Sequence, residues 1–312
     1  MKNILSIDGG GIRGIIPAIV LAEIERVTGK PICQLFDLIT GTSTGGILAL
    51  GLVKDSGSGE PQFSAKELID IYRQRGRDIF SRSFWKGMSS VAGLMDEKYP
   101  SDGIEKVLEE YLGHEPLGAA LNNVMITSYD LGNRKPLFFK SWKTSFYQTE
   151  MRHVARATSA APTYFEPALI PTCGSLAALI DGGVFINNPA VSAYAEALKL
   201  FPGEDIRVLS IGTGELIRPI DHGEACDWGK AGWMLPVLDC VFDGVSNAAD
   251  YQMEQFLGEN YIRLQVALED AADDMDNASK GNIRLLEAEA ERLLEVNRHV
   301  IESLFSTSDA IA

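Results

Sequence analysis

A serine between two glycines, at the junction of an apolar strand and an apolar helix, most restricts how this chain can fold. Residues 35–40 are short and apolar, as in a buried strand, and residues 46–53 suit a buried helix. Between them stands Gly41-Thr42-Ser43-Thr44-Gly45, the pattern of a nucleophile elbow. Such a turn strains the serine backbone and holds the hydroxyl at a helix N-terminus, while side chains at positions 41 and 45 would collide with the neighbouring strand and helix. Ser43 is therefore a candidate nucleophile, which requires an oxyanion site and a base.

A glycine-rich loop, Asp8-Gly9-Gly10-Gly11-Ile12-Arg13-Gly14, follows the first predicted strand. Its G-x-G-x-x-G spacing matches a dinucleotide fingerprint, but the second strand ends in the Ser43 turn instead of the acidic residue that would hold a ribose. A plain tight turn is another interpretation, although it needs fewer glycines. The third is an oxyanion hole, in which the N–H groups of Gly10 and Gly11 converge on an acyl oxygen beside Ser43. Arg13 orients this loop or contacts a phosphate, or else forms a surface salt bridge.

Free serine is a weak nucleophile, so the chain must supply a base. None of its four histidines lies in a glycine-flanked loop at a strand end: His114, His153, His222 and His299. Asp181 does, because it ends an apolar strand-like run and precedes Gly182 and Gly183. A carboxylate at the carboxyl end of a parallel strand lies where such sheets place their sites, although an Asp-Gly turn is the plain alternative. To accept the proton of Ser43, Asp181 needs a pKa raised by desolvation.

Strands and helices alternate along the chain, which predicts a mainly parallel sheet with helices on both faces. Strands are expected over residues 2–7, 35–40, 122–129, 136–141, 177–180, 206–211 and 261–266. Helices are expected over residues 15–29, 46–53, 102–112, 149–158, 189–200, 236–257 and 282–305. Another helix begins at Ser64, where Glu67 completes a capping-box spacing. In this chain the serine elbow follows the second strand. In an α/β-hydrolase the elbow follows several strands, and the catalytic histidine comes last in the sequence. A Ser–Asp dyad therefore fits the order of motifs in this chain better than a Ser–His–Asp triad.

Composition limits the classes of partner and compartment. The 312 residues include 28 basic and 43 acidic ones, and the net charge of −15 opposes binding to nucleic acid. The four cysteines form neither a CxxC pair nor a metal-ligand spacing, which is typical of reduced thiols in the cytoplasm. The N-terminal strand is too short for a signal peptide, and no apolar run reaches the ~18–20 residues that span a bilayer. These features predict a cytoplasmic protein.

Together, these residues resemble the patatin-like phospholipase family. The resemblance rests on the loop at residues 8–14, the elbow at 41–45 and the Asp181-Gly182-Gly183 turn, in that order, and on the segments 157–165 and 209–214. It implies a three-layer α/β/α sandwich, with residues 1–214 as the catalytic core and residues 215–312 as a helical C-terminal extension packed on the same domain. It also implies hydrolysis of fatty-acyl esters in phospholipids or other acyl lipids.

The resemblance assigns a role to each motif residue. It makes Ser43 the nucleophile and Asp181 the base. Gly9, Gly10 and Gly11 would form the oxyanion site, with Arg13 beside them, while Gly41, Gly45, Gly182 and Gly183 shape the turns. In this mechanism Asp181 takes the Ser43 proton and later activates water, so neither a metal nor an organic cofactor is required.

One basic segment could bring so acidic a protein to a membrane surface. Residues 73–88 carry five basic residues against one acid and end in aromatic and apolar side chains. Phe84, Trp85, Lys86 and Met88 form a candidate docking tip, since cationic stems with aromatic ends suit lipid interfaces. The plain alternative is a helix end whose aromatic residues pack into the core.

Three other functions remain open from the sequence. An acyltransferase would use the same elbow with an acceptor other than water. Some patatin-like proteins are effectors that degrade membranes when a nucleotide signal binds, and no motif here suggests such a regulatory site. A storage or scaffold protein with a vestigial site is disfavoured by the intact motifs. An oligomer is compatible with the sequence.

Overall fold

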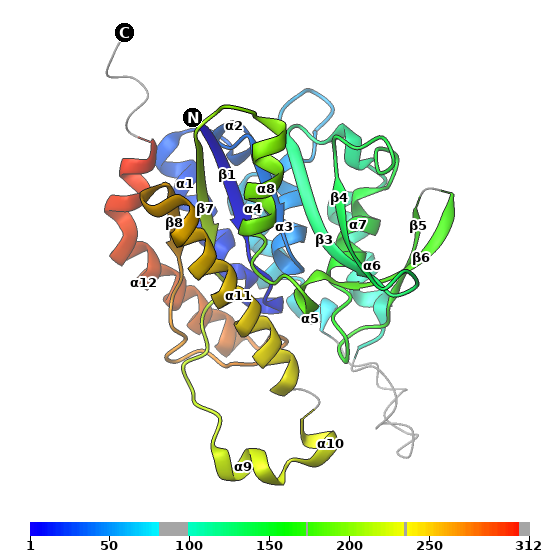
Figure 1. The fold of residues 1–312 in the computed structure, drawn as a ribbon, viewed down its shortest axis with the longest axis vertical. Helices are drawn as coiled ribbons and strands as arrows, with labels where there is room; N and C mark the ends of the chain where they lie inside the picture. The colour runs from blue at the N-terminus through cyan, green and yellow to red at the C-terminus, as the bar shows by residue number, and fades with distance from the viewer. Residues whose placement is uncertain (81–98, 173, 234–235, 306–312) are drawn as a thin grey trace.

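A computed structural model describes residues 1–80, 99–172, 174–233 and 236–305, and its centre is a mixed sheet (Figure 1). The strand order is β5-β6-β3-β2-β1-β7-β8, with β4 also paired to β3. The parallel strands are β1 (Lys2–Ile7), β2 (Leu38–Gly41), β3 (Asn123–Asp130), β7 (Ile206–Ile211) and β8 (Tyr261–Leu264). The antiparallel strands are β4 (Lys135–Lys140), β5 (Ala168–Thr172) and β6 (Ser175–Asp181).

Helices cover both faces of this sheet, which confirms the predicted α/β sandwich (Figure 1). One face packs against α1 (Ile15–Thr28), α3 (Thr44–Val53), α4 (Ala65–Arg73), α6 (Ser101–Leu112), α7 (Met151–Thr158) and α12 (Lys280–Phe305). The other packs against α8 (Ala190–Leu200) and α11 (Pro236–Leu257). Shorter helices are α2 (Ile32–Leu35), α5 (Gly76–Ile79), α9 (His222–Asp227) and α10 (Gly229–Gly232). Short 3-10 turns lie at Gly11–Gly14, Leu117–Ala119, Gly182–Val184 and Gly258–Asn260.

The central strands are apolar on both sides because both sides are covered. In β1, Leu5 packs into one hydrophobic cluster and its neighbour Ile4 into the other. Helix α3 is buried along its whole length, as its unbroken apolar sequence indicates. The capping box at Ser64 and Glu67 is present at the start of α4.

Two local predictions were wrong in detail. The strand expected over 35–40 begins at Leu38, because Pro31 starts a turn of helix that lasts to Leu35. Strand β5 was not predicted, and it contains Pro171. β5 lies at the edge of the sheet, where a missing backbone donor is tolerated.

The C-terminal part joins the sheet as well as covering it. Strand β8 forms the edge beside β7, and α12 packs on α1. Arg263 of β8 makes an ion pair with the buried Asp8, with 2.6 Å between Nη2 and Oδ2. The division of the chain into residues 1–214 and 215–312 stays a prediction, but the glycine-rich loop is anchored by residues from both parts.

Candidate active site

Ser43 occupies a strained turn between β2 and α3. Its backbone has φ 54° and ψ −124°, a conformation that L-residues rarely adopt. A Cβ on Gly41 would lie 2.2 Å from the carbonyl oxygen of Gly45, and one on Gly45 would lie 2.3 Å from that of Ile7. These contacts are those that the sequence pattern predicted. A residue of α7 also stabilises the elbow, because the Ser43 N–H donates a hydrogen bond to Thr158 Oγ1 over 2.9 Å.

The glycine-rich loop lies beside this elbow because β1 and β2 are parallel neighbours, with Ile7 paired to Gly41. A Cβ on Gly9 would lie 3.2 Å from that of Ser43. Within the part of the chain that the structure describes, the N–H groups of Gly10 and Gly11 have no hydrogen-bond acceptor. Two free donors next to a serine hydroxyl can stabilise an oxyanion.

Several polar groups from distant segments hold the loop in place. The Gly9 N–H donates to the carbonyl oxygen of Asn187 over 3.1 Å, and Thr213 Oγ1 donates to the carbonyl oxygen of Gly9 over 2.7 Å. The Ile12 N–H donates to the carbonyl oxygen of Met275 over 2.8 Å. Sequence reasoning missed these supports. Two supporting residues lie in segments that resemble the family and could have been found there: Thr213, which bonds the loop, and Thr158, which bonds the elbow.

Arg13 is buried, which excludes the interpretation as a surface salt bridge. It lines a second, polar cavity with Asp8 and Asp243, rather than the pocket that contains Ser43. Its Nε donates to the carbonyl oxygen of Gly10 over 3.4 Å. The guanidinium therefore contacts the back of the loop.

Asp181 lies level with Ser43 across the sheet, although not for the reason given by the sequence. We expected a parallel strand, but β6 runs antiparallel to β3. Gly41 pairs with Ile126, and two residues further along Ser128 pairs with Asp181. Since Ser43 is also two residues beyond Gly41, this register brings the serine and the carboxylate to the same level.

The environment of Asp181 changes its acidity. Burial raises the pKa of its carboxyl to about 7, and hydrogen bonds with the Ser43 side chain and the Gly183 N–H limit the rise. The Gly183 bond to Oδ1 measures 2.7 Å. A Cβ on Gly182 would lie 2.2 Å from Thr127 Oγ1, so glycine is required for the turn to sit this close to β3. A carboxylate with a pKa near 7 can accept a proton and return it at neutral pH.

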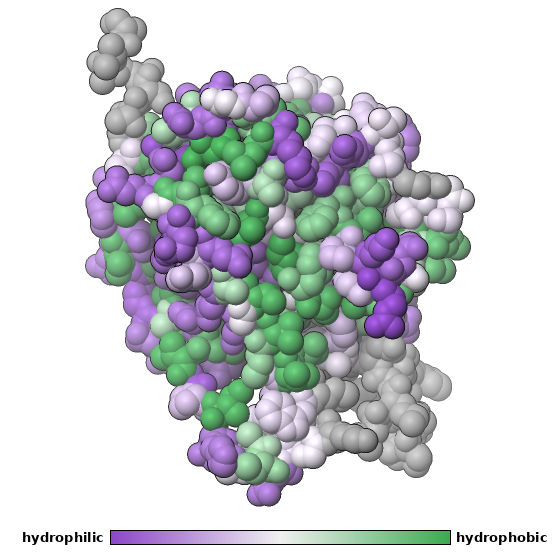
Figure 2. Space-filling model, in the orientation of Figure 1, coloured by the Kyte–Doolittle hydropathy of each residue, from purple (hydrophilic) through white to green (hydrophobic). Residues whose placement is uncertain are grey.

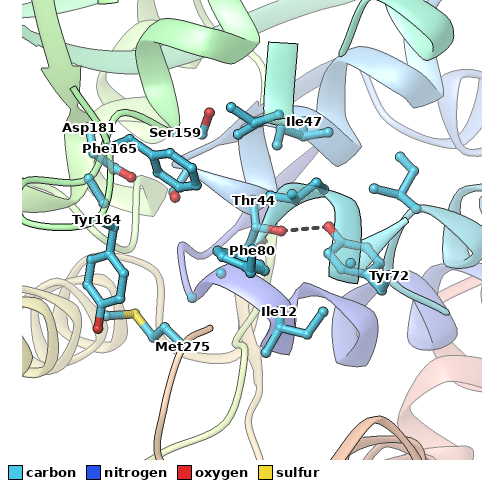
Figure 3. Close-up of a pocket in the computed structure, with 18 of the residues that line it drawn as sticks. Ile12, Thr44, Ile47, Tyr72, Phe80, Ser159, Tyr164, Phe165, Asp181 and Met275 are labelled. Atoms are coloured by element: carbon cyan, nitrogen blue, oxygen red, sulfur yellow. Dashed lines mark hydrogen bonds between the residues drawn. The ribbon is translucent and has the colours of Figure 1, made fainter. Parts of the chain in front are cut away.

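A largely apolar pocket opens beside Ser43 and Asp181 (Figure 3). Its aliphatic and aromatic lining comes from the glycine loop, α3, α4, α5 and the residue after it, α6, α11 and the segment after α7: Ile12, Ile47, Ile71, Tyr72, Ile79, Phe80, Ile104, Tyr164, Phe165 and Phe242. In its wall, Thr44 Oγ1 and the Tyr72 hydroxyl share a hydrogen bond of 2.6 Å (Figure 3). An apolar pocket with few polar groups at one end suits a hydrocarbon chain that ends in a polar reacting group.

The candidate docking tip, Phe84, Trp85, Lys86 and Met88, lies outside the described residues. Across the residues that are described, no helix is long and apolar enough to cross a membrane. In the same residues no group of three or more His, Cys, Asp or Glu side chains is arranged to hold a metal ion.

Comparison with known proteins decides the family. The model of the patatin-like phospholipase family matches residues 5–194. This chain belongs to the patatin-like phospholipase family. It is therefore a lipid acyl hydrolase, a class of carboxylic ester hydrolases.

Patatin-like relatives match along nearly the whole chain. It is 30% identical to patatin-like protein 4 of Arabidopsis thaliana and 32% identical to patatin group M-3 of Solanum tuberosum. Each match covers 95% of this chain and 84% of the relative. Among solved structures, human GIVD cytosolic phospholipase A2 aligns with a TM-score of 0.49 and 11% identity, covering 97% of this chain and 60% of that one.

Proposed function

We propose that this patatin-like protein hydrolyses fatty-acyl esters of phospholipids or related lipids through a Ser43–Asp181 dyad. The observation that carries the proposal is the buried carboxyl of Asp181, which lies level with Ser43 in the same pocket and whose pKa burial raises to about 7. Such a pair activates serine without histidine, because the carboxylate itself is a strong enough base at neutral pH.

In the first half-reaction, Ser43 Oγ attacks the acyl carbonyl carbon and its proton passes to Asp181. The carbonyl oxygen becomes an oxyanion, which accepts hydrogen bonds from the N–H groups of Gly10 and Gly11. The tetrahedral species then loses the alcohol or lysolipid, which takes the proton from Asp181, and the acyl group remains on Ser43 as an ester.

In the second half-reaction, Asp181 takes a proton from water, and the resulting hydroxide attacks the acyl-Ser43 carbonyl. The bond from carbon to Ser43 Oγ breaks, the fatty acid leaves, and the proton on Asp181 returns to the serine. The apolar pocket supports an acyl chain rather than a polar substituent on the reacting carbonyl.

Kinetics with a soluble acyl ester test the dyad. Ser43→Ala and Asp181→Asn should each abolish turnover. Asp130→Asn is a matched control, because Asp130 is also buried and ends β3 but binds Asn133 instead of the serine. Full activity in Asp181→Asn would rule out the dyad. Mass-spectrometric profiling of lipids treated with wild type and Ser43→Ala would then identify the substrates, and acylated acceptors other than water would reveal transferase activity.

A further inference from the structure

A row of polar side chains crosses three strands of the sheet just before the glycine-rich loop begins. In β1, β7 and β8, residues that pair side by side pack into the second hydrophobic cluster, beneath α8 and α11: Ile4, Val208 and Tyr261. Two positions further along each strand, and so on the same face, the paired residues are polar: Ser6, Ser210 and Arg263. Helices α8 and α11 lie over this face (Figure 1), and side chains close over it in the space-filling view from the same side (Figure 2). The polar row therefore belongs to the interior.

Arg263 connects this row to Asp8, the first residue of the loop. The Nη2 atom of Arg263 lies 2.6 Å from Asp8 Oδ2, and its Nη1 donates a hydrogen bond to Ser210 Oγ over 2.8 Å. The Asp8 side chain is 2% exposed and the Arg263 side chain 13%. In the described part of the chain, Arg263 is the one cation within 4.0 Å of the Asp8 carboxyl. The negative charge of Asp8 therefore depends on Arg263 for its compensation.

The guanidinium is itself held from a third direction. Asp250 of α11 has its Oδ1 atom 3.8 Å from Arg263 Nε, and the Tyr261 hydroxyl donates to the same oxygen over 2.8 Å. The planar guanidinium thus meets Asp8, Ser210 and Asp250 with three different nitrogen atoms. A lysine has one nitrogen and could not make all of these contacts at once.

The position and charge of Asp8 bear on the candidate oxyanion site. Asp8 directly precedes Gly9, and the free N–H groups of Gly10 and Gly11 follow within three residues. A shift of Asp8 would move these donors. An unpaired carboxylate so close to them would also repel the negative charge that develops on the acyl oxygen, and this repulsion is strong in the protein interior.

We propose that Arg263 is a positioning residue for the oxyanion loop, because it ties Asp8 to β7 and neutralises the charge of its carboxylate. The inference rests on the proposed function, since the effect is on an oxyanion that only attack by Ser43 would create. It gives the last strand of the sheet, far from the motifs in sequence, a part in transition-state stabilisation.

Kinetics with a soluble butyrate ester test the proposal. Arg263→Gln should lower kcat about 30- to 100-fold and change KM by less than about twofold, because the loop acts on the transition state and not on the bound ester. Arg263→Lys keeps the charge beside Asp8 and should recover about tenfold of that loss. Lys140→Gln is the matched control. It removes an ion pair with Glu196 of similar burial on β4, at 3.1 Å, and should leave kcat unchanged.

A transition-state analogue gives a readout that loss of stability alone would not change. A short-chain trifluoromethyl ketone forms a hemiketal with serine, and its oxyanion would occupy the site beside Gly10 and Gly11. Its inhibition constant should rise by the same factor as kcat falls in Arg263→Gln. Adding Asp8→Asn to Arg263→Gln removes the unpaired charge, so this double variant should be more active than Arg263→Gln and less active than wild type.

Several outcomes would overturn the positioning role. They are wild-type kcat in Arg263→Gln, a loss confined to KM, equal losses in the glutamine and lysine variants, or a double variant no more active than Arg263→Gln. Thermal melts establish that each variant is folded. If Arg263→Gln does not fold, the double variant takes its place, and wild-type kcat and ketone affinity in it would overturn the role equally. Ester hydrolysis that survives Ser43→Ala would instead refute the proposed chemistry, whatever the Arg263 variants do.

Discussion

The backbone N–H of Ser43 donates a hydrogen bond to Thr158 Oγ1, a residue 115 positions further along the chain, over 2.9 Å. The elbow places this N–H outside the strand and helix hydrogen bonds, so it needs a partner from elsewhere. Thr158 ends α7 and is fully buried, which leaves no water to take its place. The conformation of the candidate nucleophile therefore depends on a helix from a distant part of the chain.

Thr158→Val should lower kcat about 10- to 100-fold with little change in KM. The substitution keeps the shape but leaves the Ser43 N–H without an acceptor, which costs about 1–3 kcal/mol. Thr158→Ser keeps the hydroxyl and should retain most of the activity. The rate at which a fluorophosphonate labels Ser43 provides a second measurement, since it reports the position and activation of the serine itself. Equal rates in the valine and serine variants would disprove this positioning role.

The pH profile of kcat/KM on a soluble ester should show one acidic limb with a midpoint at about pH 7. Burial raises the pKa of Asp181 to about 7, and only the ionised carboxyl can accept the Ser43 proton. Activity should therefore rise tenfold per pH unit below the midpoint and level off above it. A midpoint near 4 would mean that Asp181 is not the base, or that it is far more hydrated than its burial indicates.

Asp181→Asn should stabilise the protein at pH 8 and lose this advantage toward pH 4. The folded pKa of about 7 lies above the ordinary value of 3.8, so the folded state holds a proton that the unfolded state releases between these pH values. The wild type thus loses stability as pH rises through this window, whereas the uncharged amide does not. Calorimetric Tm values of both proteins at pH 4 and pH 8 measure the difference.

Asp130→Asn provides a control of opposite sign for that experiment. Burial raises the pKa of the Asp130 carboxyl, but hydrogen bonds with Asn133 outweigh this effect, so the pKa lies below its usual value. Its charge therefore stabilises the fold above that value, and the variant should lose stability at pH 8 relative to low pH. The explanation fails if both variants shift Tm in the same direction with pH.

Gly10→Ala should reduce kcat about 100-fold. The added Cβ would lie 2.2 Å from Thr213 Oγ1, so the loop must move. Its N–H groups would then no longer point at the oxyanion. Loss of one such donor costs about 3 kcal/mol. Gly244→Ala is the matched control, because a Cβ there meets nothing within 4 Å and lies in α11. It should keep full activity and gain up to about 1 kcal/mol of stability.

Local patterns in the sequence determined the elements that carry the site. The apolar runs on either side of residues 41–45 predict the strand, the turn and the helix, because the glycines satisfy steric limits that act over a few residues. The adjacency of the glycine loop and the elbow also followed, since sequential parallel strands tend to be neighbours. The alternation of strands and helices predicted the two covered faces of the sheet.

Tertiary structure alone decided how Asp181 reaches Ser43. The carboxylate lies level with the serine because β6 pairs antiparallel with β3 in one register, and a short apolar run does not specify the direction of a strand. Tertiary contacts also decided that Arg13 faces the back of the loop and that Thr158 and Thr213 hold the two turns. These hydrogen bonds join residues far apart in the chain, so their geometry depends on packing of the whole sheet and its helices, which no local pattern encodes.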